Sequence, residues 1–262
     1  MNEPKWINPV KKKLEAGQTV LATTITVNSV DVAAHAARLG FDFLWIEMEH
    51  SPVTLETLRN MVLATRGLPA LPFARVPVNE IWAAKRVLDA GVFGVMFPFT
   101  STPELARQAA AACRYPPVGC RGSGPVLAKF GWPEAESYHD CADANVMVIA
   151  IIEEARAVER IDEIAATPGV DVLFIGTSDL SFSLGLRGNQ QHTKLDEAIA
   201  KIVEAGKKHG KFLGRPAGTA AKIAEYRKQG FQVFQTATEI GLMSEGARSL
   251  FQSLGDLKLG DV

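Results

Sequence analysis

One pattern recurs six times along the chain and restricts the folds open to it: a helix-like segment, a glycine and a short apolar segment. Glycine just after a helix adopts a left-handed backbone conformation that other residues resist, so it marks helix ends. These glycines are Gly40, Gly67, Gly91, Gly169, Gly210 and Gly230. With two further apolar segments the chain contains eight predicted strands, at 20–27, 43–46, 71–76, 92–97, 146–152, 170–175, 211–214 and 231–236.

The alternation of strands and helices predicts a parallel sheet with right-handed crossovers. The strands are apolar almost throughout, as in sheets that protein covers on both faces. Eight units in 262 residues favour an α/β fold of the closed (β/α)8 TIM barrel type, as a single domain over residues 1–262. A doubly wound open sheet is the alternative. Helix starts are predicted at Thr102, which precedes Pro103, and at Asn79 and Thr193.

Composition excludes several classes of protein. Apolar residues make up 47% of the chain and charged residues 22%, and the formal net charge is −1. These values argue against a disordered chain and against a nucleic-acid partner. No apolar segment approaches the ~20 residues of a membrane span, and no signal-peptide core precedes the fold. The three cysteines have no metal-ligand spacing and do not suggest disulfides, so we expect a cytoplasmic globular protein.

Three segments stand outside the repeat. Residues 6–15 predict a short basic helix before the barrel. Residues 114–145 begin with dense prolines and glycines, which disfavour regular structure, and long loops of this kind often bind ligands or act as lids. Residues 239–254 predict a closing helix with an apolar stripe. That stripe either completes the outer layer of the barrel or packs on a neighbouring subunit.

The segment Phe-Asp-Phe-Leu-Trp-Ile-Glu-Met-Glu-His-Ser-Pro at 41–52 marks a candidate active site. Its apolar strand ends in Glu47, Glu49 and His50. In parallel barrels the carboxyl ends of the strands form the active site, so titratable side chains there indicate function. The alternative is an ordinary strand end with solvated charges.

Other predicted strands also end in polar residues. The strand at 71–76 contains Arg75, the one at 146–152 leads to Glu153, and the one at 170–175 leads to Asp179. Two carboxylates on adjacent strands, with water or substrate oxygens, suit a divalent metal such as magnesium, manganese or cobalt. Taken singly, each carboxylate is more typical of a helix N-terminus. Arg75 suits the binding of an anion or oxyanion, or a salt bridge to one of these carboxylates.

Two further features complete the candidate site. His50 is the only histidine predicted at a strand end, and a histidine beside a metal can transfer a proton near neutral pH. The turn Gly176-Thr-Ser-Asp179 offers several backbone N–H groups that can hold a carboxylate.

These segments resemble the HpcH/HpaI family of class II pyruvate aldolases. The likeness rests on the 41–52 segment, on Arg-Tyr-Pro-Pro-Val-Gly-Cys-Arg-Gly-Ser-Gly at 114–124, on Ile-Ile-Glu at 151–153, and on Phe-Ile-Gly-Thr-Ser-Asp-Leu-Ser at 174–181. It extends from about residue 17 to 253. The resemblance implies a (β/α)8 barrel that makes or breaks a carbon–carbon bond through a pyruvate enolate, with a divalent metal and in a homohexamer whose last helix packs on a partner.

The resemblance also implies roles for single residues. Glu153 and Asp179 match the metal ligands, and His50 matches the histidine of the proton-transfer step. Arg75 matches the arginine that neutralises the enolate oxygen, and Asp89 matches an aspartate paired with the histidine. The substrate carboxylate would be held by backbone N–H groups of the 176–179 turn, in the family at Ser178 and Asp179, with Gly176 beside them.

Three positions depart from the family's pattern. The family usually has Asp where this chain has Glu47, Gln where it has Ile151, and Pro where it has Thr177. The expected reaction is cleavage of a 4-hydroxy-2-oxo acid to pyruvate or hydroxypyruvate and an aldehyde, and the departures bear on which aldehyde is accepted. The alternatives are a citramalyl- or malyl-CoA-type lyase of a related branch, for which no clear CoA site is found, and a barrel that binds a ketoacid without catalysis.

Overall fold

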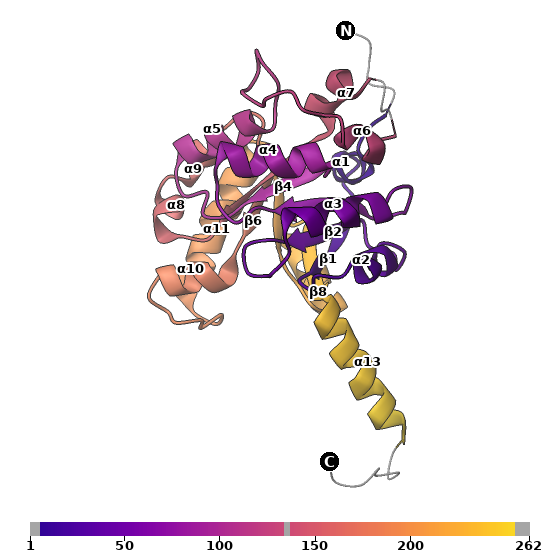
Figure 1. The fold of residues 1–262 in the computed structure, drawn as a ribbon. Coiled ribbons are helices and arrows are strands. Elements are labelled where there is room, and N and C mark those ends of the chain that lie inside the picture. The colour runs from indigo at the N-terminus through magenta and orange to yellow at the C-terminus, as the bar shows by residue number, and fades with distance from the viewer. Residues whose placement is uncertain (1–5, 134–136, 255–262) are drawn as a thin grey trace.

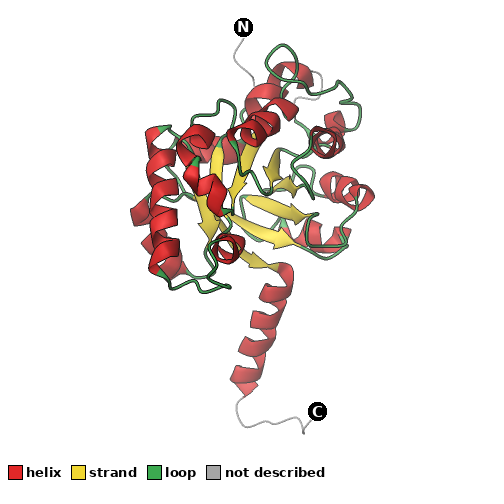
Figure 2. Ribbon diagram, turned by 90° about the vertical axis from the view of Figure 1, so that its left-hand side faces the viewer, coloured by secondary structure: helices red, strands yellow, loops and turns green. Residues whose placement is uncertain are grey.

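Eight parallel strands close into a barrel in the order of the sequence, and helices surround it (Figures 1 and 2). The computed structural model describes residues 6–133 and 137–254. Val20 in the first strand pairs with Val233 in the last, so the (β/α)8 TIM barrel is confirmed and the open sheet is excluded. The strands are β1 (Val20–Ile25), β2 (Phe43–Glu47), β3 (Leu71–Arg75), β4 (Gly94–Phe97), β5 (Met147–Ile152), β6 (Val172–Ile175), β7 (Phe212–Pro216) and β8 (Val233–Thr238).

The helices follow the strands as predicted. All six marker glycines have positive φ, between 63° and 108°, and two of them directly cap helices. Figure 1 labels most of the helices, and Figure 2 shows them around the barrel. They are α1 (Pro9–Glu15), α2 (Val30–Ala36), α3 (Leu55–Ala64), α4 (Ile81–Ala90), α5 (Pro103–Ala112), α6 (Ala128–Gly131), α7 (Tyr138–Asn145), α8 (Ala155–Glu159), α9 (Ile161–Ala165), α10 (Thr177–Ser183), α11 (Thr193–Lys208), α12 (Ala220–Gln229) and α13 (Glu239–Leu254).

Only one of the three predicted helix caps is confirmed. Thr102 caps α5, and its hydroxyl accepts a hydrogen bond from the Leu105 N–H. Asn79 does not cap α4: its side-chain amide donates to Thr100 on the neighbouring loop instead. The cap of α11 is His192, one residue before the predicted Thr193, because the imidazole Nδ1 accepts the Lys194 N–H at 3.1 Å.

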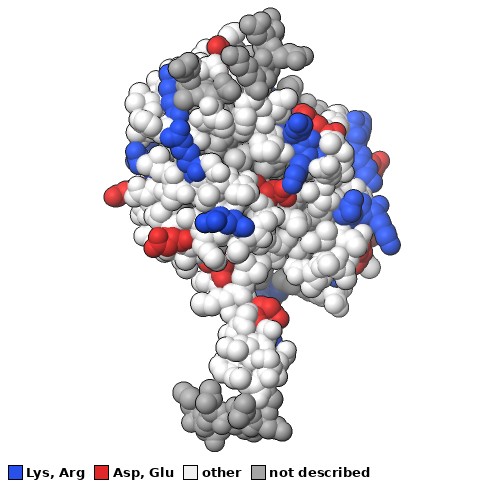
Figure 3. Space-filling view, turned by 90° about the vertical axis from the view of Figure 1, so that its right-hand side faces the viewer, with Lys and Arg blue, Asp and Glu red and all other residues white. Residues whose placement is uncertain are grey.

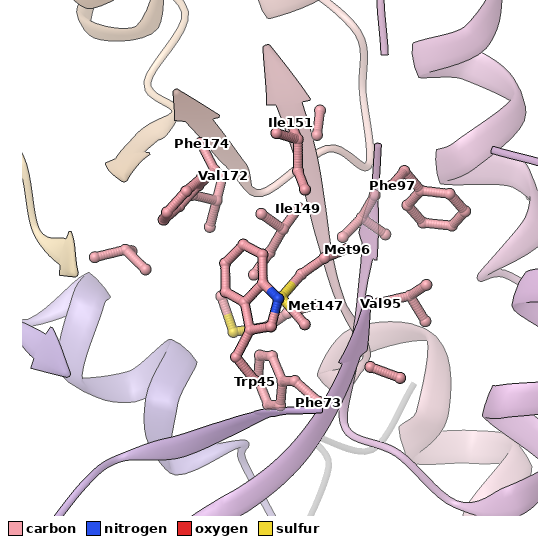
Figure 4. Packing of buried hydrophobic residues seen from close by; sticks show 14 of the residues in the cluster. Trp45, Phe73, Val95, Met96, Phe97, Met147, Ile149, Ile151, Val172 and Phe174 are labelled. Atoms are coloured by element: carbon pink, nitrogen blue, oxygen red, sulfur yellow. The ribbon is translucent and has the colours of Figure 1, made fainter. Parts of the chain in front are cut away.

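Side chains on the strands point alternately into the barrel and towards the helices. Figure 4 shows Trp45 surrounded by other apolar side chains, Phe73 and Met147 among them. The Trp45 ring lies 4.8 Å from that of Phe174, and Phe43 stacks on Phe73 with ring centroids 4.6 Å apart. The layers of the barrel interior that contain Trp45, Phe73 and Phe174 are therefore packed with apolar side chains. Above them, each strand has one more inward-pointing position, at its carboxyl end.

The segment 114–145 lies at the opposite end of the barrel from the strand carboxyl ends, because it leads from α5 into the start of β5. Its first part is irregular, as predicted, but α6 and α7 form in its second part, where no helix was expected. Trp132 stacks on Phe93 at 4.6 Å and its indole N–H donates to the Gly91 carbonyl. Within one chain the described parts of this segment, 114–133 and 137–145, lie at the bottom of the barrel and not over the strand carboxyl ends.

The two terminal helices have different surroundings. The predicted helix at 6–15 is observed as α1, which begins at Pro9 because Asn8 caps it. The closing helix α13 spans Glu239–Leu254 and projects away from the barrel (Figures 1 and 2). None of its residues is buried, so within one chain it does not complete the outer layer. No helix in the described part of the chain is long and apolar enough to cross a membrane.

Candidate active site

The top of the barrel, where the strands have their carboxyl ends, carries a layer of polar side chains. These side chains occupy the inward-pointing positions directly above the apolar layers. On β2 and β3 these are Glu47 and Arg75, two residues beyond Trp45 and Phe73, and the two lie opposite each other in the strand register. On β5 the inward series continues from Ile151 to Glu153. Of the polar residues predicted at the strand ends, Glu47, Glu49 and Arg75 are in contact.

Glu47 is buried, with 4% of its surface exposed, and both of its carboxylate oxygens are engaged. Oε1 accepts hydrogen bonds from the backbone N–H groups of Glu49 and His50, at 2.7 and 3.0 Å. Oε2 lies 2.7 Å from Arg75 Nε and accepts the Trp45 indole N–H at 3.3 Å. The structure places the Glu47 carboxylate under the turn that follows β2.

Arg75, Glu49 and His50 form a chain of charged contacts above Glu47. Arg75 Nε lies 3.1 Å from Glu49 Oε2, and the same oxygen lies 3.6 Å from His50 Nε2. The salt-bridge alternative for Arg75 is therefore observed, through Nε, which leaves its two terminal nitrogens as donors for a ligand. Burial raises the pKa of Glu49, and the neighbouring Glu47 and Asp179 raise it further against the opposing effect of Arg75.

Glu153 is the most deeply buried of the two predicted metal ligands. Its Oε1 accepts the Phe99 N–H at 2.7 Å. Phe99 has a φ of 46°, a left-handed conformation that is rare outside glycine and often occurs at functional sites. Burial raises the pKa of Glu153 to about 7, and the charges of Glu49 and Asp179 add to the effect.

Gly176 makes room for that carboxylate. A Cβ atom at residue 176 would lie 2.6 Å from Glu153 Oε2, so any side chain there would displace the Glu153 side chain. Asp179 lies in the first turn of α10, close enough to raise the pKa of both Glu49 and Glu153. The first N–H groups of a helix have no partner within it, and in α10 these include the N–H groups of Ser178 and Asp179.

The donor set fits a divalent cation. Glu47 and Glu49 contact Arg75, Glu153 and Asp179 are close enough to interact electrostatically with Glu49, and the Glu49 Oε2 atom is buried without a hydrogen-bond partner. A cation bound here would stabilise the ionised forms of Glu49 and Glu153, which burial and the neighbouring carboxylates disfavour. No group of three or more His, Cys, Asp or Glu side chains in the described residues is close enough to hold a metal alone. Magnesium commonly takes one or two carboxylates and completes its shell with water and substrate oxygens.

Asp89 is separated from this site within one chain. It lies in the last turn of α4, which leads into the start of β4, so it is at the bottom of the barrel. Its ion-pair partner is Arg121, at 3.4 Å. Burial raises the pKa of Asp89, and Arg121 opposes the rise. The expected pairing of Asp89 with His50 is thus not formed within the chain, where the His50 ring lies beside Glu49.

Two contacts of the site were missed from the sequence. Glu47 holds the His50 turn, and Phe99 donates its N–H to Glu153. The inward position of Glu47 could have been recognised in the sequence, because it follows Phe43 and Trp45 at intervals of two residues on the same strand. The Phe99 contact has no such signal, since only the closed barrel brings the loop after β4 beside the end of β5.

A cavity of about 710 Å³ lies on the outer surface between α11 and α12, with Arg215 and Tyr226 in its lining. None of the residues of the polar layer lines it, so the cavity has no part in the candidate site.

Comparison with known proteins agrees with this geometry. The chain is 34% identical to a hydroxypyruvate/pyruvate aldolase of Paraburkholderia phytofirmans, with 95% of this chain and 98% of the relative covered. It is 33% identical to a 5-keto-4-deoxy-D-glucarate aldolase of Salmonella arizonae, with 95% and 98% covered. A crystal structure of a HpcH/HpaI aldolase/citrate lyase family protein from Burkholderia cenocepacia superposes with a TM-score of 0.87 at 34% identity, over 94% of this chain and 99% of that one.

The profile of one family matches most of the chain. It covers residues 25–245, which include every strand from the end of β1 to β8 and all the residues of the polar layer. On this match, and on the full-length relatives, the chain belongs to the HpcH/HpaI aldolase/citrate lyase family.

Proposed function

We propose that the protein is a metal-dependent class II aldolase that reversibly cleaves a 4-hydroxy-2-oxo acid to pyruvate, or hydroxypyruvate, and an aldehyde. The observation that carries this proposal is the polar layer, in which the buried Glu153 and the nearby Asp179 leave an excess of negative charge beside a single arginine. The relatives named as aldolases, at 33 and 34% identity over their full length, support the same reaction class.

In this proposal Glu153 and Asp179 hold a magnesium, manganese or cobalt ion, which would supply Lewis-acid stabilisation of the negative charge on the ketone oxygen. The terminal nitrogens of Arg75 donate to the same developing charge, and the first N–H groups of α10, at Ser178 and Asp179, bind the substrate carboxylate. A base removes a proton from C3 of pyruvate, and the enolate carbon attacks the aldehyde carbonyl. The alkoxide that forms takes up a proton, and cleavage is the reverse.

His50 is the group we assign to the proton transfer. Its ring is largely exposed, with 63% of the side chain accessible, and it contacts Glu49. If Asp89 also pairs with this histidine, the pairing forms between two chains, because the two residues lie at opposite ends of one barrel.

A homo-oligomer, a hexamer by resemblance, supplies that second chain. The exposed apolar stripe of α13, with Met243, Leu250 and Phe251 more than half exposed, offers a contact surface. Figure 3 shows this projecting helix as mostly uncharged. Mixing His50→Ala and Asp89→Ala subunits tests this arrangement. Activity that returns in the mixed assembly would support a pairing between chains. If each variant is inactive alone and the mixture is inactive as well, the pairing between chains is contradicted.

Turnover with a panel of substrates separates the candidate functions. The proposal predicts carbon–carbon bond formation between pyruvate or hydroxypyruvate and small aldehydes, with loss of activity in chelator. A CoA-type lyase would instead cleave a citramalyl- or malyl-CoA thioester, and a ketoacid-binding barrel would bind pyruvate and turn over neither. Cleavage of the thioester without aldol activity would contradict the proposal. We expect the reaction to take place in the cytoplasm, with no membrane or nucleic-acid partner.

A further inference from the structure

We propose that Glu47 is a positioning residue: it fixes both the orientation of Arg75 and the conformation of the turn that carries His50, and it does not itself contact substrate. This inference rests on the proposed aldolase function, and it concerns a residue at which the chain departs from its family.

Glu47 holds the turn that follows β2. One oxygen of the Glu47 carboxylate accepts the N–H groups of Glu49 and His50, at 2.7 and 3.0 Å. The Ser51 hydroxyl donates to the Glu47 carbonyl. Residues 48–51 are therefore closed around a single residue, and the position of the His50 backbone depends on it.

Glu47 also contacts Arg75. The other oxygen lies 2.7 Å from Arg75 Nε, and the strand register places the two residues side by side on β2 and β3. From below, the Trp45 indole N–H donates to the same oxygen. Because Trp45 is packed in the apolar interior (Figure 4), its ring fixes the carboxylate and, through it, the guanidinium.

No part of this carboxylate is left for a ligand. Glu47 is 4% exposed, and each oxygen has two partners among the described residues. A buried carboxylate is stable only when it is paired and hydrogen-bonded in this way. Glu49 Oε2, by contrast, lies 3.1 Å from Arg75 Nε but accepts no hydrogen bond. The effect of Glu47 on the reaction therefore passes through Arg75 and the His50 turn.

This arrangement predicts a specific kinetic change. Misplacing a catalytic group by about 1 Å can lower a rate by about a hundredfold, and Arg75 acts on charge that grows during the reaction, more than on bound pyruvate. A change at Glu47 should therefore lower kcat for proton exchange at C3 of pyruvate and leave the KM for pyruvate nearly unchanged.

The experiment compares Glu47→Gln, Glu47→Asp and Glu56→Gln by exchange of the pyruvate methyl protons in deuterium oxide with manganese. Glu56→Gln is the matched control, since Glu56 is exposed in the first turn of α3. We expect Glu47→Gln to lower kcat at least about tenfold with a KM within about threefold. Glu47→Asp, which keeps the charge but is one methylene shorter, should also lower kcat, and the control should match the wild type. In an Arg75→Ala background, Glu47→Gln should cause a smaller loss than in the wild type, since coupled residues are not additive and only the effect through the His50 turn remains.

Several results would overturn the inference. Wild-type exchange in both Glu47 variants would show that the turn and Arg75 do not depend on this residue. A large rise in KM at unchanged kcat would show that Glu47 binds substrate directly. A full additional loss in the Arg75→Ala background would show that Glu47 does not act through Arg75. If Glu47→Gln does not fold, the kcat and KM of Glu47→Asp decide between these outcomes. Absence of exchange in the wild type would instead contradict the proposed function.

Discussion

The two ends of the barrel are closed in different ways. At the bottom, the rings of Trp6, Phe93 and Trp132 pack on one another, with centroids 4.6 to 5.4 Å apart. The side chains of Asn8 and Asn145 bridge the N-terminal segment to α7 through hydrogen bonds of 2.6 to 3.0 Å. At this end aromatic rings and hydrogen-bonded asparagine side chains fill the space, although the buried Arg121 has two side-chain nitrogens without a hydrogen-bond partner.

At the top, the same inward positions carry charge. Glu49, Glu153 and Asp179 repel one another, and burial raises the pKa of Glu153 to about 7. Strained backbone at Phe99 supports Glu153. Perturbed and incompletely paired groups of this kind are typical of functional sites. Within one chain, the aromatic cluster at the bottom of the barrel contributes stability and the polar layer at the top contributes the proposed chemistry. Asp89 is the residue at the bottom to which we assign a catalytic role, through a neighbouring chain. Four predictions test this division.

The largest effect is expected from the proposed metal ligands. Glu153→Ala and Asp179→Ala should each abolish metal-dependent pyruvate exchange, because each change removes one of the two proposed carboxylate ligands of the metal. Exchange by proton NMR with and without manganese is the measurement. Both variants should fold, since removing a repelling carboxylate relieves buried charge; a folded variant with wild-type exchange would show that the residue is not a ligand.

Trp132→Ala at the bottom should cost about 3–5 kcal/mol of unfolding free energy, because it removes a fully buried ring and the hydrogen bond to Gly91. Urea unfolding gives this value. At a temperature where the variant is folded, kcat for pyruvate exchange should stay near that of the wild type. A fall in kcat as large as that expected for Arg75→Ala would contradict the division between the two ends.

Arg75→Ala should lower the rate of pyruvate exchange about a hundredfold or more, in line with the removal of one donor to a developing oxyanion. The measurement is kcat with saturating metal, and Arg107→Ala is the control, because Arg107 is exposed on α5 and its ion pair, with Glu104, is exposed as well. Normal turnover in Arg75→Ala would remove the proposed role of this arginine.

The smallest effect concerns pH. Because the pKa of Glu153 is raised from 4.5 to about 7 in the folded protein, the folded state holds a proton that the unfolded chain releases. Stability of the metal-free protein should therefore fall as pH rises from about 4.5 to 7. Between pH 5 and pH 8, Glu153→Gln should reduce this fall by about 2 kcal/mol in urea unfolding. An identical pH dependence in both proteins would contradict the raised pKa.

The barrel was predictable because its signals are local. Gly91 and Gly230 mark helix ends through their own backbone conformation, and the apolar strands are continuous in the sequence. The roles of Glu47 and Phe99 could not be predicted, because they depend on which strands become neighbours when the barrel closes. The same limit applies to Asp89, whose residue type matched the family's pattern while its position in the chain is at the other end of the barrel.

The most direct test of the central claim is metal-dependent exchange of the methyl protons of pyruvate in deuterium oxide by the wild-type protein. It requires no knowledge of the aldehyde, and it reports enolate formation at the top of the barrel alone. We predict rapid exchange with magnesium, manganese or cobalt, and its loss when a chelator is added. Exchange that is absent with all three metals, or that is unchanged in chelator, would contradict the account.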